Sequence, residues 1–221
     1  MNSLRLVSAL ALTLAVLPAT VLAAGAPSVS GRVMDTEGKA VANAVVFVQE
    51  ALANDAAAAP ESRTATMDQV NKTFVPGLLP IVVGTRVHFP NHDQIKHHVY
   101  SFSRTKSFEL PLYKGEDALP VLFDKVGVVK LGCNIHDWMS AIILVLPTAH
   151  FAVTDAEGRF VLTDLPRGAY KLAAWHVQSK ANPDETEQSV QVGAAVPEIT
   201  FALALVPMRA RAAMHGSRGE P

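Results

Sequence analysis

Short apolar runs dominate the chain from residue 29 onward, and they constrain its fold more than any other feature of the sequence. These runs alternate apolar with polar residues or are rich in β-branched residues, so they predict β-strands rather than helices. We expect strands at residues 29–33, 44–48, 81–89, 98–102, 126–131, 141–146, 151–154, 160–163, 169–175, 189–192 and 198–204. Turns that end in glycine, such as 35–38 and 155–158, separate some of them. Many short strands joined in this way predict an all-β chain built as sandwiches.

The first residues have the pattern of a secretory signal peptide. Arg5 carries a positive charge ahead of an uncharged apolar run, Leu6 to Leu17, and small residues follow at 21–23. The run is shorter than the ~20 residues needed to cross a bilayer, and no positive cluster flanks its far end. We therefore expect residues 1–23 to be removed on export. The mature protein would then lie in the periplasm or outside the cell, without a membrane span.

The charge balance argues against nucleic acid and anionic lipid as partners, and the cysteine content argues against a disulfide. The chain has 19 Lys and Arg against 20 Asp and Glu, a formal net charge of −1. It therefore lacks the excess of positive charge that binding to nucleic acid or to anionic lipid requires. Cys133 is the single cysteine, so no intramolecular disulfide can form. An unpaired thiol in an exported protein needs a chemical reason.

Three side chains that can bind a soft metal lie in one short loop between two predicted strands. They are Cys133, His136 and Met139. Thiolate and thioether are soft donors and imidazole is intermediate, so this set favours copper over magnesium or calcium. A trigonal blue-copper site needs one more nitrogen, and the adjacent His97 and His98 beside an upstream strand can supply it. The sequence therefore predicts one copper ion of type 1.

The segment that carries this loop resembles the cupredoxin family, of the plastocyanin kind. The resemblance rests on residues 82–91 (VVGTRVHFPN), on 123–127 (FDKVG) and on the ligand loop, and it covers nearly all of 63–147. It implies a Greek-key β-sandwich. It also implies a complete set of copper ligands, namely His97, Cys133, His136 and Met139.

The same resemblance implies one-electron transfer rather than catalysis. His136 would lie near the surface and pass the electron through an apolar patch that includes Ile135 and Trp138. Asn91 would support the first ligand. The partner would be a cytochrome or a periplasmic oxidoreductase. An enzyme is not expected, because we find no second metal cluster and no organised acid and base pair.

The two ends of the mature chain resemble a second kind of domain, the carboxypeptidase regulatory-like sandwich of transthyretin type. The resemblance rests on residues 30–46 and on 154–172, which are far apart in the sequence. We expect a discontinuous sandwich formed by 28–50 and 148–206, with 51–62 as a linker, 63–147 inserted as the cupredoxin domain and 207–221 as a disordered tail. Two incomplete repeats flanking a middle domain are the competing arrangement.

The combination of these segments resembles bacterial proteins labelled methylamine-utilisation-like or plastocyanin-like. That resemblance implies an exported copper protein that carries single electrons. Two alternatives remain open. In one, the same ligands store or deliver copper in the periplasm. In the other, the outer sandwich is a cell-surface binding module and the copper site is accessory.

Overall fold

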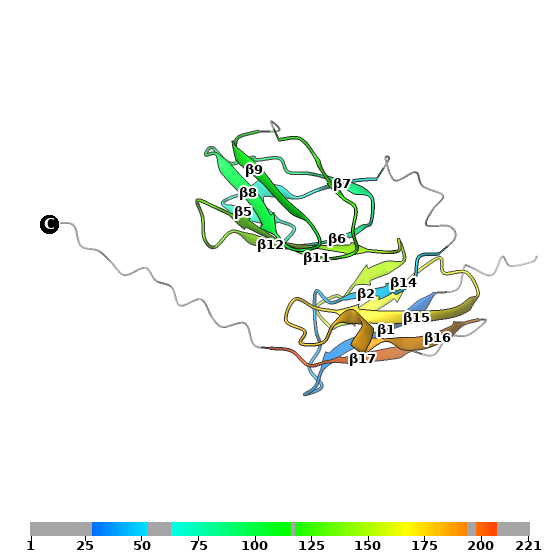
Figure 1. Cartoon of the computed structure of the whole chain (residues 1–221). Helices are drawn as coiled ribbons and strands as arrows, with labels where there is room; N and C mark the ends of the chain where they lie inside the picture. Colours follow the sequence, from blue (N-terminus) through cyan, green and yellow to red (C-terminus); the bar gives the residue numbers. More distant parts are fainter. Residues whose placement is uncertain (1–27, 53–62, 116–117, 194–197, 207–221) are drawn as a thin grey trace, which may run out of the picture.

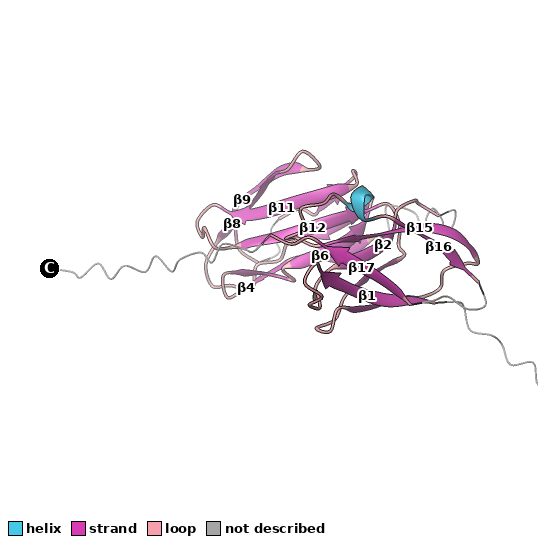
Figure 2. Ribbon diagram, turned by 90° about the horizontal axis from the view of Figure 1, so that it is seen from below, coloured by secondary structure: helices cyan, strands magenta, loops and turns pink. Residues whose placement is uncertain are grey.

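The computed structural model of the protein describes residues 28–52, 63–115, 118–193 and 198–206. Within these ranges the regular structure is β-strand apart from one short 3-10 helix, η3 (Pro183–Thr186), so the predicted all-β class is confirmed (Figure 2). The predicted leader 1–23, residues 53–62 of the predicted linker and the predicted tail 207–221 lie outside the described residues. No described helix has the length and apolar character that a membrane crossing requires.

Two sheets combine strands from both ends of the chain, and together they form the lower unit of Figure 1. The strands are β1 (Val29–Asp35), β2 (Val45–Val48), β13 (Phe151–Val153), β14 (Arg159–Leu162), β15 (Gly168–Trp175), β16 (Gln188–Val192) and β17 (Ile199–Leu203). One sheet has the order β14-β1-β17 and the other β13-β2-β15-β16. β1 pairs antiparallel with β14 and parallel with β17. Buried side chains such as Val33, Leu162 and Phe201 fill the core between the two sheets.

The strands between residues 64 and 146 form the upper unit of Figure 1. They are β3 (Thr64–Thr66), β4 (Asp68–Val70), β5 (Thr73–Val75), β6 (Leu78–Val82), β7 (Thr85–His88), β8 (His97–Phe102), β9 (Ser107–Tyr113), β10 (Val121–Phe123), β11 (Gly127–Cys133) and β12 (Ser140–Leu146). A five-stranded sheet has the order β6-β12-β11-β8-β9, and smaller sheets have the orders β10-β7-β3 and β4-β5. Phe74, Phe89, Phe123 and Ile143 belong to the buried core of this unit. This core also contains the cysteine and the methionine of the ligand loop.

One predicted strand is wrong, and several short ones are absent from the prediction. Residues 81–89 do not form a single strand, because β6 ends at Val82 and β7 begins at Thr85 in a different sheet. Gly84 makes the break possible, since its φ of 89° lies in the left-handed region. The three-residue strands β3, β4, β5 and β10 are too short to carry a recognisable alternation, and β9 contains a proline.

A third apolar core joins the two units face to face. Its buried members are Val45, Phe47, Leu144, Leu146, Ala173 and Trp175. Strand β2 is buried along its whole length, because it contacts its own partner sheet on one side and this third core on the other. The two sandwiches therefore share continuous apolar packing, which stabilises one arrangement of the units.

We expect Phe47→Ala to lower the free energy of unfolding by about 3–5 kcal/mol, the usual cost of removing a buried aromatic ring. Phe47 is only 5% exposed, and it lies in the core between the two units. Phe102→Ala is the matched control, because Phe102 is 79% exposed, and we expect its effect to stay within about 0.5 kcal/mol. Urea unfolding followed by tryptophan fluorescence measures both. Equal losses would contradict the packing between the units.

Candidate metal centre

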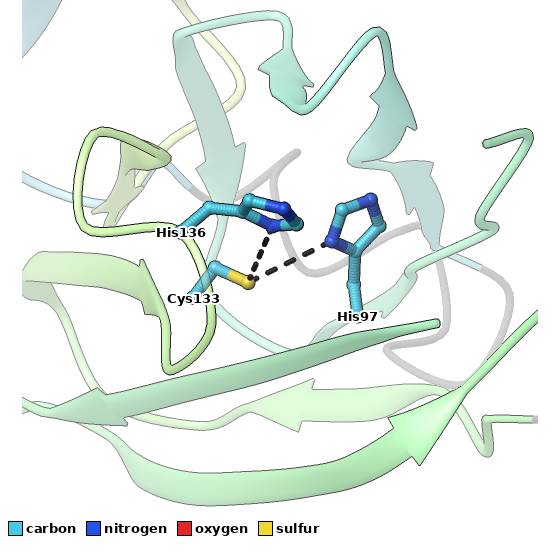
Figure 3. A group of neighbouring side chains, drawn as sticks. All are labelled: His97, Cys133 and His136. Carbon is cyan, nitrogen blue, oxygen red and sulfur yellow. Dashed lines mark hydrogen bonds between the residues drawn. The ribbon is translucent and has the colours of Figure 1, made fainter. Parts of the chain in front are cut away.

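Three of the four predicted ligands converge at one point in the upper unit (Figure 3). His97 begins β8, Cys133 ends β11, and His136 lies in the loop that leads to β12. The Sγ atom of Cys133 is 3.7 Å from Nδ1 of His97 and 3.7 Å from Nδ1 of His136. The three donor atoms all lie within 4.8 Å of one another. One sulfur and two imidazole nitrogens therefore face a common position.

His98 does not join this group. Its side chain lies on the other face of β8, where Nε2 is 2.8 Å from Oε1 of Glu109, without the alignment of a hydrogen bond. Successive side chains of a strand point to opposite faces, so only one of two adjacent histidines can face the upper core. His97 is that residue, with 0% exposure.

Backbone contacts shape the loop that carries the other ligands. Gly132 pairs with Tyr100 across β11 and β8, and the tyrosine ring covers it so closely that an added Cβ would lie 2.7 Å from a ring carbon. Further along, the backbone N–H of Met139 donates to the carbonyl of His136 at 2.9 Å. Met139 is 2% exposed and belongs to the same buried cluster as Cys133. Met139, the fourth predicted ligand, is therefore buried at the end of this loop.

Asp93 contacts a predicted ligand, although no motif in the sequence points to it. Its Oδ2 atom is 2.8 Å from Nε2 of His97, on the opposite side of the ring from the cysteine. The same carboxylate accepts hydrogen bonds from the backbone N–H groups of Asn71, at 2.6 Å, and Lys72, at 2.7 Å. In a neutral ring the proton then resides on Nε2, which leaves the Nδ1 lone pair free for a metal. An acidic residue four positions before a histidine is too common in loops to predict this pairing from sequence.

Asn91 holds the loop that carries both Asp93 and His97. It is 3% exposed, and its Nδ2 group donates to the carbonyls of Ile95 at 2.9 Å and Tyr113 at 3.0 Å. Its Oδ1 atom accepts a hydrogen bond from the backbone N–H of Asp93 at 3.0 Å. The support expected from Asn91 therefore acts through the loop backbone and the carboxylate rather than on the imidazole directly.

The local electrostatics favour the neutral form of one donor, His136. Desolvation lowers the pKa of His136, and electrostatic interactions with His97 and Lys72 lower it further, so the neutral ring is favoured at neutral pH. Burial alone would raise the pKa of Asp93, but hydrogen bonds from His97 and from two backbone N–H groups outweigh it and lower the pKa. Burial raises the pKa of Tyr113 to about 12, and the nearby Cys133 adds to this. Tyr113 therefore remains a neutral phenol beside the cysteine.

The donor set fits copper. The set consists of a cysteine sulfur, two imidazole nitrogens and a methionine that is buried in the same loop as the cysteine. This combination is typical of a type 1 copper site. Across the ranges that the structure describes, His97, Cys133 and His136 are the one group of His, Cys, Asp or Glu side chains arranged in this way. Such a site is selective because soft sulfur donors disfavour magnesium and calcium.

We expect Asp93→Ala to weaken copper binding about 10- to 100-fold, the usual effect of removing a carboxylate that orients a ligating histidine. Without the carboxylate, the His97 ring can rotate and its proton can move to Nδ1. Competition titration against a chelator of known affinity measures the change. Asp124→Ala is the control, because Asp124 is an exposed carboxylate paired with Lys106 at 3.2 Å. A similar loss in both variants would contradict the role of Asp93.

Part of this chain is similar to proteins of known structure. No protein-family model and no curated protein matches the sequence. A copper-containing nitrite reductase from Thermus scotoductus SA-01 is 28% identical over 37% of this chain, with a TM-score of 0.35, and the match spans 22% of the reductase. A purple cupredoxin from Nitrosopumilus maritimus is 26% identical over 38% of this chain and 99% of its own, with a TM-score of 0.33. A reduced mutant of amicyanin is 21% identical over 47% of this chain and 98% of its own, with a TM-score of 0.35.

Proposed function

We propose that this chain is an exported mononuclear copper protein that carries single electrons, with a cupredoxin-like site of type 1. One observation carries the proposal. The Sγ atom of the single cysteine and the Nδ1 atoms of two histidines, from separate parts of the chain, face a common position in the core of one sandwich. The ligands we propose are His97, Cys133, His136 and Met139. Copper, when bound, supplies a one-electron change between two oxidation states.

The residues around the site suit electron transfer because they hold the ligands in place. His97 is restrained by its hydrogen bond to the Asp93 carboxylate, and Asn91 acts through the loop by accepting a hydrogen bond from the backbone N–H of Asp93. The backbone of Cys133 pairs with Val99 of β8 at the end of the five-stranded sheet. A rigid set of donors changes little when the metal changes its charge, so the reorganisation energy stays small. No bound substrate and no proton transfer are needed.

His136 offers the route from the surface to the metal. It is half-buried, and its ring centroid is 5.1 Å from that of Trp138, which is 57% exposed. Ile135 beside it is 47% exposed. We propose that these two apolar side chains form the contact through which an electron enters or leaves, with a cytochrome or a periplasmic oxidoreductase as the partner.

We also propose the domain division and the location. The division into a discontinuous outer sandwich (28–50 and 148–206) and an inserted copper domain (63–147) is supported by the sheets, because strands before and after the insert share them. The type of the outer sandwich, carboxypeptidase regulatory-like, rests on the sequence resemblance. Location in the periplasm or outside the cell rests on the leader pattern of residues 1–23 and on the unpaired cysteine.

Visible spectroscopy and redox cycling of the purified protein test the proposal. Loading with one equivalent of copper(II) should produce intense visible absorption from the thiolate, and a mild reductant should remove it reversibly. Rapid exchange of electrons with a c-type cytochrome would support the carrier role. Absence of intense absorption would refute the type 1 site. Slow redox cycling together with copper transfer to a metal-free acceptor would favour storage or delivery instead.

A further inference from the structure

The loop of residues 89–97 carries Asp93 and His97 to the proposed copper site, and its first residues run through the buried core. Phe89, for example, is 2% exposed. A backbone carbonyl that is buried without a hydrogen-bond donor is costly, so this segment needs donors from the surrounding core. Two buried side chains supply them. The role that we assign to these two side chains rests on the proposed function.

The first donor is Gln69 of β4, which is 0% exposed. Its Nε2 group donates to the carbonyl of Phe89 at 3.2 Å and to that of Pro90 at 3.1 Å. Its Oε1 atom is buried without a hydrogen-bond partner among the described residues, so the amide acts here as a donor. Its backbone pairs with the same segment, because its N–H donates to the Pro90 carbonyl and its carbonyl accepts from the N–H of His92. Gln69 therefore fixes the start of the loop through both main chain and side chain.

The second donor is Tyr113, the last residue of β9, which is 7% exposed. Its hydroxyl donates to the carbonyl of Phe89 at 2.6 Å and accepts a hydrogen bond from Nε2 of Gln69 at 2.5 Å. Its backbone carbonyl accepts a hydrogen bond from the side chain of Asn91 at 3.0 Å. Its backbone also pairs with His97 across β8 and β9. Tyr113 therefore contacts both the start and the end of the loop.

The pairing of β8 with β9 changes register next to His97. Val99 lies opposite Leu110, but His97 lies opposite Tyr113, so β9 has one extra residue between the two pairs. A bulge of this kind interrupts the regular pairing and changes the direction of nearby side chains. The position of His97 therefore does not follow from the register of the rest of the strand pair. The contacts of Tyr113 fix it locally.

We propose that these two side chains are positioning residues of the copper site and that they act on His97 through Asp93. The side-chain hydrogen bonds of Gln69 and Tyr113 go to backbone carbonyls and to each other rather than to a proposed ligand. The Asp93 carboxylate is 2.8 Å from Nε2 of His97. A loop that shifts at its start moves this carboxylate away from the ring, so the ring loses the contact that orients its Nδ1 atom.

Copper titration of a double-mutant cycle tests this route. Tyr113→Phe removes one hydroxyl and keeps the ring, and we expect it to weaken copper binding about 3- to 10-fold, less than the ~10- to 100-fold expected for Asp93→Ala. In the Asp93→Ala background, the same change should alter the affinity by less than about twofold, because the carboxylate through which it acts is missing. Gln69→Met, which keeps the side-chain length without the donors, should behave in the same way. Equal effects with and without Asp93, or no effect of Tyr113→Phe, would overturn the proposal.

Tyr170→Phe is the matched control. The Tyr170 hydroxyl also donates to a backbone carbonyl, that of Pro166 at 2.9 Å, but it lies in the other sandwich. We expect its removal to leave the copper affinity within about twofold of the unaltered protein. A loss in Tyr170→Phe equal to that in Tyr113→Phe would show a general effect of stability and would overturn the positioning role.

Nitrogen NMR of the histidine rings in the metal-free chain gives a readout that needs no copper. We expect the His97 proton to reside on Nε2 in the unaltered protein and to be shared between the two ring nitrogens in Tyr113→Phe and Gln69→Met. An unchanged His97 ring in both folded variants would overturn the proposal. A changed ring, together with a copper-loaded protein that lacks intense visible absorption, would refute the proposed function and leave the positioning of His97 standing.

Discussion

We expect Cys133→Ser to remove the intense visible absorption proposed for the copper-loaded protein, and to weaken copper binding by more than the ~10- to 100-fold expected for loss of a supporting residue. The absorption comes from charge transfer between a thiolate and copper, and a serine hydroxyl supplies neither the soft donor nor the negative charge at neutral pH. Cys133 is the single cysteine, so no other thiol can replace it. Visible absorption and chelator competition measure the two effects.

The substitution must leave the fold intact for this result to be read as loss of a ligand. Cys133 is 3% exposed, so a buried hydroxyl without a partner costs about 1–3 kcal/mol of stability. Cys133→Ala avoids that cost and should give the same loss of absorption. Unfolding curves of both variants check that the chain still folds. Retained absorption in a folded variant would show that Cys133 is not the thiolate ligand.

The second large effect separates two adjacent histidines. We expect His97→Ala to abolish the intense absorption and His98→Ala to leave it almost unchanged. His97 presents Nδ1 to the cysteine sulfur at 3.7 Å, whereas the side chain of His98 is on the opposite face of β8 beside Glu109. The two variants remove the same chemical group one residue apart, so each is the control for the other.

Added imidazole refines this experiment. In His97→Ala the missing ring leaves space in the core, and free imidazole can bind copper there and restore part of the absorption. Such rescue would show that the chain is folded and that a nitrogen donor is the missing element. Loss of absorption in His98→Ala, with His97→Ala still coloured, would contradict the ligand assignment.

The donor types of the ligand loop can be predicted from local sequence. A cysteine, a histidine and a methionine at short spacing after an alternating strand specify soft donors on one short loop, whatever surrounds them. Alternation also dictates that His97 and His98 face opposite ways. The break between β6 and β7 cannot be predicted from the apolar pattern, because the segment 81–89 keeps its apolar residues across Gly84.

The all-β class, most strand positions and the chemical kind of donor can be predicted from the amino-acid sequence, because they depend on side-chain alternation and identity along short stretches of chain. Two other features arise only in the folded chain: Asp93 contacts both His97 and the turn at Lys72, and β2 is buried on both sides between two sheets. These contacts join residues whose separation in space depends on strand register and sheet packing. Local propensity contains no information about either, so only the folded chain brings the carboxylate, the turn at Lys72 and the proposed copper ligands together.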